Sequence, residues 1–193
     1  MTDYITGRAN MADVLKDYYD TGNDSIAGIS ATTTIWAQSF IASSGYDLSR
    51  IDILAHRTGS PGAITVAIRA IDGDDKPTGA NLVSGSFDGD TMGNGSGAET
   101  WVQCDMSSPY SLTNGVKYAI CVYGASVGAS DNISWWFADP GAYANGTIIR
   151  STDSGAAWKV FADYDAMFRT YGSSGGGGLS IPIVQYYNKQ LGG

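Results

Sequence analysis

Residues that could transfer protons are scarce in this sequence. His56 is the only histidine, so a Ser-His-Asp arrangement would have to use it, with Asp52 as one candidate for the orienting carboxylate. The single match to the G-x-S-x-G pattern, from Gly172 to Gly176, lies in a glycine-rich stretch and not at a strand-to-helix turn. Many aspartate pairs would suit glycoside hydrolysis, but their spacing singles out none of them. We therefore predict no catalytic residues and no enzymatic activity.

Aspartate-rich turns raise the question of cation binding. Asp72, Asp74 and Asp75 lie close together in the sequence, and Ca²⁺ prefers oxygen ligands from carboxylates and backbone carbonyls. The spacing differs from that of an EF-hand loop, because neither the central glycine nor the closing glutamate is in place. We interpret the segment as a hairpin loop with solvated carboxylates, which leaves these three residues as weak metal candidates. No metal and no other cofactor is predicted.

Aromatic side chains offer a different chemistry, which is stacking against a sugar ring. Trp135 and Trp136 are adjacent, so on a strand they must point to opposite faces, one into the core and one to the surface. Tyr143 and Trp158 fall in nearby predicted loops. Three polar residues could supply hydrogen bonds beside them: Asp139, Asn145 and Asp153. The four aromatic residues are candidates for a glycan-binding platform, but also for capping the fold or, with more weight, for contacting another subunit.

The elements that would position these residues are predominantly strands. Residues 63–71 show the clearest period of two, with Ile64, Val66 and Ile68 on one face and Thr65 and Arg69 on the other. Turn-forming residues separate this segment from others of the same kind. The further predicted strands are residues 36–41, 50–54, 82–87, 101–106, 116–123, 133–137, 146–150 and 166–171. Their spacing predicts an all-β fold, an antiparallel β-sandwich of the jelly-roll kind, over residues 28–172.

The N-terminal residues 1–27 are predicted to form an arm with one short helix. Asn10-Met-Ala-Asp13 resembles a helix cap, and Gly22 would end the helix. Between them, four apolar residues fall at helical spacing: Met11, Val14, Leu15 and Tyr18. This arm would pack either against its own domain or against a neighbouring molecule, and the sequence favours neither.

The C-terminal residues 173–193 are predicted to form a hinge followed by a second, extended arm. Residues 175–178 are consecutive glycines, a composition typical of a hinge. The apolar residues that follow would cost stability if left in water, and Pro182 confines them to a sheet edge or an extended conformation. The predicted contact residues of this assembly arm are Leu179, Ile181, Pro182, Ile183, Val184, Tyr186 and Tyr187. We expect the arm to cross to a neighbouring subunit, by strand addition or by docking in a groove.

Composition narrows the range of partners. The formal net charge of −8 argues against binding to nucleic-acid phosphates, and no segment reaches the length of a membrane-spanning helix. The first residues lack the basic start and apolar run of a signal peptide, so no export is expected. Without export, Cys104 and Cys121 are interpreted as buried free thiols, with a disulfide as the alternative.

A set of motifs between about residues 17 and 172 carries a resemblance to a known family. They are Tyr19-Asp-Thr-Gly-Asn-Asp24, Trp36-Ala-Gln-Ser-Phe40, Arg57-Thr-Gly-Ser-Pro-Gly62, Ile64-Thr-Val-Ala-Ile-Arg-Ala70, Lys76-Pro-Thr-Gly79, Tyr110-Ser-Leu-Thr-Asn-Gly-Val-Lys-Tyr-Ala-Ile120 and Ser151-Thr-Asp-Ser-Gly-Ala-Ala-Trp158. These motifs resemble a jelly-roll-like β-sandwich domain family found in phage and virus structural proteins and in bacterial and archaeal surface proteins. The family is similar in outline to carbohydrate-binding modules.

The resemblance implies a function in structure or in binding. Secreted members of the family usually carry the domain in a longer chain with an export signal, so a lone domain without one favours a virion component made in the host cytoplasm. We expect a non-enzymatic structural protein of a phage or virus particle: a capsid decoration, fibre or tail-associated protein that binds itself or another virion protein through its arms. The alternative is a carbohydrate-binding module for cell-surface or secreted glycans, located outside the cell or at its surface.

Overall fold

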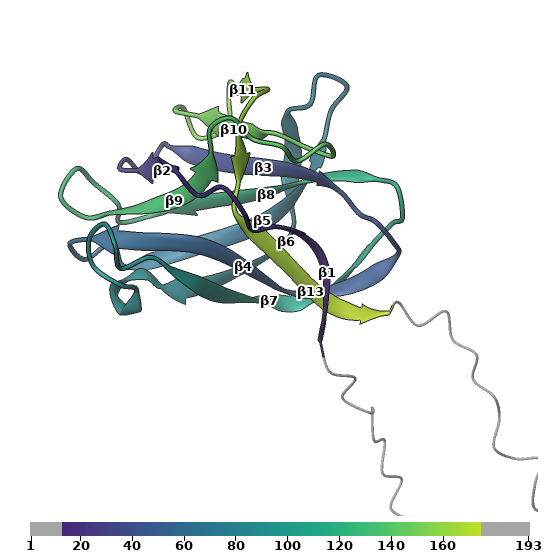
Figure 1. The fold of residues 1–193 in the computed structure, drawn as a ribbon, viewed down its shortest axis with the longest axis horizontal. Coiled ribbons are helices and arrows are strands. Elements are labelled where there is room, and N and C mark those ends of the chain that lie inside the picture. The colour runs from purple at the N-terminus through teal and green to yellow at the C-terminus, as the bar shows by residue number, and fades with distance from the viewer. Residues whose placement is uncertain (1–12, 175–193) are drawn as a thin grey trace, which may run out of the picture.

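Two antiparallel sheets packed face to face form the fold in the computed structural model, which describes residues 13–174 (Figure 1). Every ladder between the named strands is antiparallel. The short 3₁₀ turn η1 (Gly89–Thr91) is the single helical element in this range, and no helix there has the length and apolar character needed to span a membrane. The prediction of an all-β fold with two packed antiparallel sheets is confirmed.

Sheet A contains both the first and the last strand of the described chain. Its strands are β1 (Val14–Tyr19), β2 (Ser25–Ile29), β4 (Tyr46–Thr58), β7 (Thr100–Leu112), β9 (Asn132–Ala138), β12 (Asp165–Ala166) and β13 (Phe168–Ser174). The long strand β4 lies at the centre and pairs along one edge with β7. Along its other edge β4 pairs first with β13 and then with β9. β1 and β2 extend the sheet outward from β13 and β9, respectively.

Sheet B covers the other side of the core. In spatial order its strands are β11 (Lys159–Phe161), β10 (Ile148–Ser151), β3 (Ile35–Ile41), β8 (Lys117–Gly124), β5 (Ala63–Ile71) and β6 (Pro77–Asp88). The short strands β10 and β11 form one end of this sheet, and the β5–β6 hairpin forms the other. Strands from both halves of the sequence therefore meet in each sheet.

The core lies between the two sheets and follows the predicted alternation. Ile64, Val66 and Ile68 of β5 are fully buried in it, whereas Thr65 and Arg69 are only partly buried on the outer face. The same period of two places apolar residues of β3 and β8 inward, where they meet the inner face of β4 and β13. Burial of these apolar side chains is the main source of stability for such a sandwich.

The two cysteines are free and buried, in agreement with the sequence interpretation. Cys104 belongs to the core between the sheets, whereas Cys121 packs in a second cluster on the outer face of sheet B. Burial raises the pKa of both thiols to about 12. Both side chains therefore stay protonated and unreactive near neutral pH.

The predicted N-terminal helix is wrong for the residues that the structure describes, because residues 14–19 form strand β1. The ladder between β1 and β13 shifts register between Leu15 and Tyr18, which pair with Tyr171 and Arg169. In a regular strand, residues three positions apart face opposite sides of the sheet. The irregularity brings Leu15 and Tyr18 to the same face, as a helix would, and this explains why their spacing suggested one.

The two ends of the described chain lie side by side. Val14 at the start of β1 pairs with Gly172 near the end of β13, and Figure 1 shows both strands reaching the same corner of the sandwich. β1 and the first three residues of β2 fall within residues 1–27, predicted as an arm, and both strands are integral to sheet A. Of the predicted hinge and C-terminal arm, residues 173–193, the first two residues belong to β13, and those from residue 175 onward lie outside the described residues.

Candidate functional site

The four aromatic residues of the predicted platform do not share one surface. Trp135 is fully buried in the core, where its indole N–H donates to the carbonyl oxygen of Met167 at 2.8 Å. Trp136 points to the outer face of sheet A and is partly exposed, and its indole N–H donates to Nδ1 of His56 at 3.2 Å. The predicted opposite orientation of the two adjacent tryptophans is confirmed, and it places them on different sides of one sheet.

Tyr143 belongs to the packing of the sandwich. Its ring centroid lies 5.7 Å from that of Tyr19 and 5.5 Å from that of Phe168. Burial raises the pKa of its hydroxyl well above the ordinary range. Asp139 and Asn145, predicted as polar partners of a ligand, are exposed in the loop between β9 and β10 and do not line the pocket that contains Trp158.

Trp158 lies against the outer face of sheet B. Strands β3 and β8 present small side chains there, and Ala37, Ala119 and Cys121 are completely buried although no second sheet covers them in the described part of the chain. They form a small apolar cluster against which Trp158 packs. The small side chains leave room for the indole ring, so the loop before β11 can fold over this face.

Hydrogen bonds within residues 151–158 hold this loop in place. Asp153 Oδ1 accepts from the backbone N–H of Ala157 at 2.9 Å and from the hydroxyl of Ser151 at 2.7 Å. The Ser151 hydroxyl oxygen in turn accepts from the backbone N–H of Gly155 at 2.8 Å. The N–H of Ala157 is the main reason that the pKa of Asp153 is lowered. Asp153, predicted as a polar partner for a ligand, therefore stabilises the loop that carries Trp158.

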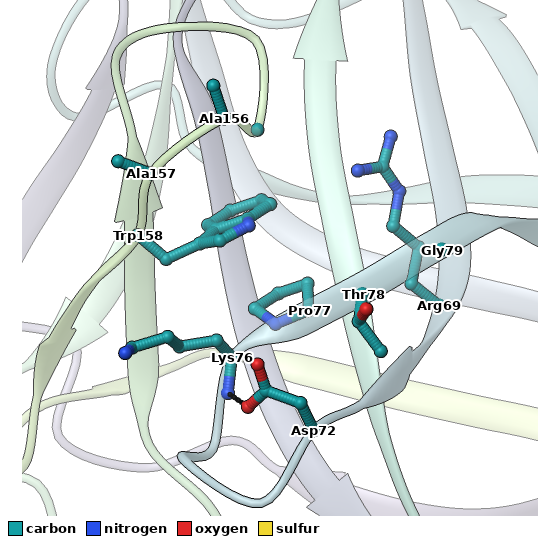
Figure 2. Close-up of a pocket in the computed structure, with 10 residues that line it drawn as sticks. Arg69, Asp72, Lys76, Pro77, Thr78, Gly79, Ala156, Ala157 and Trp158 are labelled. Carbon is teal, nitrogen blue, oxygen red and sulfur yellow. Dashed lines mark hydrogen bonds between the residues drawn. The ribbon is translucent and has the colours of Figure 1, made fainter.

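A pocket of about 480 Å³ opens between this loop and the β5–β6 hairpin (Figure 2). Its main lining residues are Arg69, Asp72, Lys76, Pro77, Thr78 and Trp158. Figure 2 shows the indole ring on one side, Pro77 near the centre, and the guanidinium group on the far side. The pocket combines the flat indole ring and the apolar proline ring with a carboxylate, an ammonium group, a guanidinium group and a hydroxyl.

The polar groups of the pocket are oriented by neighbouring residues. Arg69 Nε donates to the side-chain oxygen of Asn81 at 2.8 Å, and the amide nitrogen of Asn81 donates to the hydroxyl of Tyr123 at 2.9 Å. Asp72 Oδ1 accepts from the backbone N–H of Lys76 at 3.0 Å, which is the main cause of its lowered pKa. A flat apolar surface beside fixed charged groups suits a small polar ring such as a sugar.

The carboxylates of the three weak metal candidates form ion pairs or hydrogen bonds with residues of the hairpin and its neighbours. Asp74 pairs with Lys76 at 3.3 Å, and Asp75 pairs with Lys117 at 2.7 Å. Asp72 accepts backbone hydrogen bonds of its own turn. Within residues 13–174, no group of three or more His, Cys, Asp or Glu side chains lies close enough together to hold a metal ion.

His56 and Asp52 do not form a catalytic pair. Both lie on β4, and their separation of four residues corresponds to about 13 Å along a strand. His56 is nearly buried, with Trp136 as the donor to its Nδ1, while Asp52 Oδ1 lies 3.0 Å from Arg50 Nε. The described part of the G-x-S-x-G match, residues 172–174, belongs to strand β13 and not to a strand-to-helix turn.

The outer face of sheet A carries large side chains that the sequence did not single out as a site. Cross-strand pairing aligns residues of β1, β13, β4 and β7 in rows on this face. The guanidinium of Arg50 lies 3.8 Å from the centre of the Tyr171 ring, and that of Arg169 lies 3.9 Å from the centre of the Trp101 ring. This sheet A surface consists of Leu15, Tyr18, Arg50, Asp52, Trp101, Arg169 and Tyr171.

The sheet A surface could not be read from single segments, because its rows join strands that are far apart in the sequence. The alternation of Arg169 and Tyr171 was the local signal, since residues two apart on a strand share a face.

Comparisons with known proteins add no family assignment: no family model matches the chain, and no curated protein matches it in sequence.

Proposed function

We propose that this protein is a non-enzymatic structural component of a phage or virus particle, held in its assembly by the segments at its two ends. The observation that supports this most directly is the pairing of Val14 with Gly172, because it brings both ends of the described chain to one corner of the sandwich. A domain attached at one corner leaves the loops at its far end free to face outward. The jelly-roll-like resemblance supports a capsid decoration, a fibre or a tail-associated protein, located in the virion.

The C-terminal segment supplies the contact residues in this proposal. Residues 179–187 contain six large apolar or aromatic side chains, and each would contribute about 1.5–3 kcal/mol if fully buried, before the cost of ordering the segment. The partner is another copy of the chain or a second virion protein. The rest of the domain is already complete without this segment, because its core is filled by residues between 27 and 168.

The test compares the full chain with a chain that ends at Ser174, by size exclusion with light scattering. The truncated chain should remain folded and be monomeric, whereas the full chain should form a defined oligomer. A full-length control with Leu179, Ile181 and Ile183 all changed to serine keeps the length and removes the apolar contacts, and it should also be monomeric. If the full and truncated chains have the same oligomeric state, self-assembly through the C-terminal segment is refuted.

A second candidate function is glycan binding, and the pocket beside Trp158 is the observation that favours it. Its indole ring and its oriented charged groups could bind a sugar displayed on a cell surface or in secreted material, which would fit an extracellular location as well as a virion. We would measure binding to an immobilised glycan array with the intact chain and with Trp158→Ala. The matched control is Trp136→Ala, a partly exposed tryptophan outside the pocket. Equal binding by both variants would refute the Trp158 site.

A further inference from the structure

We propose that the free edge of β1 accepts the C-terminal segment of a second copy of this chain, with residues 179–184 adding as a strand beside Leu15 and Tyr18. The inference rests on the proposed assembly function and names the surface that the segment binds on the neighbouring molecule. Donor and acceptor lie in different parts of the chain, so each can be changed without the other.

β1 is an edge strand with exposed apolar side chains. It pairs with β13 on one side, and no strand between residues 13 and 174 pairs with its other side. The exposed fractions are 56% for Val14, 40% for Leu15 and 51% for Tyr18. Ile26 on β2, at 49%, extends the apolar row along the same side of sheet A. Unpaired edges of this kind are ready templates for another strand.

The other sheet edges in the described chain are less suitable. β7 is long, but its exposed stretch Ser107-Ser-Pro109 is polar and contains a proline. β11 has only three residues, and β6 presents exposed Thr78, Gly79 and Ala80 next to the pocket. β1 carries three exposed large apolar side chains, whereas the edge strands β2 and β6 carry one each, so β1 is the edge at which an added apolar strand would cover the most of them.

The sequence of residues 179–184 has the pattern that an added strand requires. Leu179, Ile181 and Ile183 alternate, so in a strand their side chains share one face. Pro182 lacks an N–H group, and its nitrogen would point to the edge opposite that used by Ile181 and Ile183. The segment can therefore pair along one edge only, and addition would stop after a single strand.

Side chains of the added strand would lie level with the rows of the sheet A surface. Leu15 and Tyr18 begin two of these rows, which continue across β13 and β4 through residues such as Tyr171 and Arg50. Directly opposed and diagonal neighbours on one sheet face contact one another. The apolar face of the segment would therefore pack against Leu15 and Tyr18 as a further column of the sheet.

The topology favours a second molecule as the donor. β13 ends at Ser174, beside the start of β1 at Val14. To reach the outer edge of its own β1, the C-terminal segment would have to leave β13 and pass around the N-terminal end of β1, where the chain enters that strand. Connections rarely cross one another at the same edge of a sheet, and a neighbouring molecule presents no such obstacle.

The experiment uses the full chain with Leu15→Lys and Tyr18→Lys together, because lysine on an edge strand opposes strand addition. Val116→Lys is the matched control, since Val116 is 41% exposed and lies outside sheet A. Self-association measured by sedimentation should be weakened at least about ten-fold by the β1 variant and by no more than about two-fold by the control. Amide hydrogen exchange in β1 should be slower in the full chain than in the chain ending at Ser174, and increasingly so at higher protein concentration.

Each contrary result has a distinct meaning. If the β1 variant associates as the wild type does while truncation at Ser174 gives monomers, β1 is not the acceptor and the proposed function stands. If β1 amides are protected independently of protein concentration, the segment binds within its own molecule and the second-copy proposal is wrong. If truncation leaves the oligomer unchanged, the second-copy proposal and self-assembly through the C-terminal segment are both refuted, and a second virion protein is the partner left to test for the assembly function.

Discussion

The outer faces of the two sheets differ in the side chains they present and in what covers those side chains. Sheet B presents small side chains such as Ala37 and Ala119, and the chain's own loop covers them with Trp158. Sheet A presents large side chains instead, with Arg50 stacked on Tyr171. In the described part of the chain no third sheet packs against that face. The small residues at the centre of sheet B therefore accompany a face that the chain's own loop covers, whereas the large residues of sheet A contact one another across the strands.

The pKa values of the aspartates also shift in different directions in the two sheets. Aspartates in the loops over sheet B, such as Asp153, have a lowered pKa because backbone N–H groups donate to them. Asp52 on sheet A is buried beside Arg50, and burial raises its pKa against the opposing effect of that guanidinium. The pKa of Asp165, on strand β12 of sheet A, is also raised, and burial is again the main cause. Stability should therefore respond to pH with opposite signs in the two regions.

The largest expected effect separates the inner from the outer face of sheet A. Trp135→Ala removes a fully buried ring and its hydrogen bond to Met167, so it should cost about 3–5 kcal/mol of unfolding free energy. Trp136→Ala should cost about 1–2 kcal/mol, mainly because His56 loses its hydrogen-bond donor. Chemical denaturation of both variants measures the difference. Equal losses would contradict the assignment of the two tryptophans to different faces.

A smaller effect is expected in the loop over sheet B. Gly155 has φ of +94°, and a Cβ at this position would lie 3.3 Å from Nη1 of Arg69 and 3.4 Å from the Trp158 ring. Gly155→Ala should cost about 1–2 kcal/mol of backbone strain and should also displace the indole ring. Gly115→Ala is the control, because Gly115 has φ of +76° but open space around it. A shift of the Trp158 indole N–H resonance is expected for the first variant alone, and its absence would contradict the packing described here.

The smallest expected effect is a change in the pH dependence of stability. Because burial raises the pKa of Asp165, the folded protein binds more protons than the unfolded chain between the ordinary and the raised pKa, and stability falls as pH rises through that interval. Asp165→Asn should remove this slope, which cannot exceed about 1.4 kcal/mol per pH unit for one proton.

Asp153→Asn should act with the opposite sign. The stability that Asp153 contributes is present above its ordinary pKa and is lost as pH falls through the lowered pKa, so the variant should lose less stability on acidification. Urea denaturation across the acidic range measures both slopes. If Asp165 and Asp153 contribute pH slopes of unfolding free energy with the same sign in the wild type, the contrast between buried and loop carboxylates is wrong.

The sequence predicted the central strands of the sheets better than the strands at their edges. Residues 63–71 were predicted as a strand and form β5 with the same bounds, because their period of two is regular and undisturbed. β1 was missed because its irregularity gives Leu15 and Tyr18 a helix-like spacing, and residues 25–29 of β2 were not recognised at all. Edge strands bury one side only, so their patterns are weaker.

The pocket was predicted only in part. Trp158 was named as a ligand-binding candidate, but Arg69, Lys76 and Pro77 on the other side of the pocket were not connected with it. They come from a hairpin about eighty residues earlier, and the two segments meet only because β10 and β5 belong to one sheet. A single sequence carries no local signal for such a long-range meeting, which arises from the strand order.

The neighbouring positions of Val14 and Gly172 also have a mechanical consequence. If tension were applied through both ends of the domain, the force would act along the hydrogen bonds between β1 and β13, because these bonds run perpendicular to the strands. The hydrogen-bonded residue pairs of the ladder would then break one after another, so a low force would be enough to separate the two strands. The domain is therefore suited to hang from a single attachment point and not to transmit tension between its two ends.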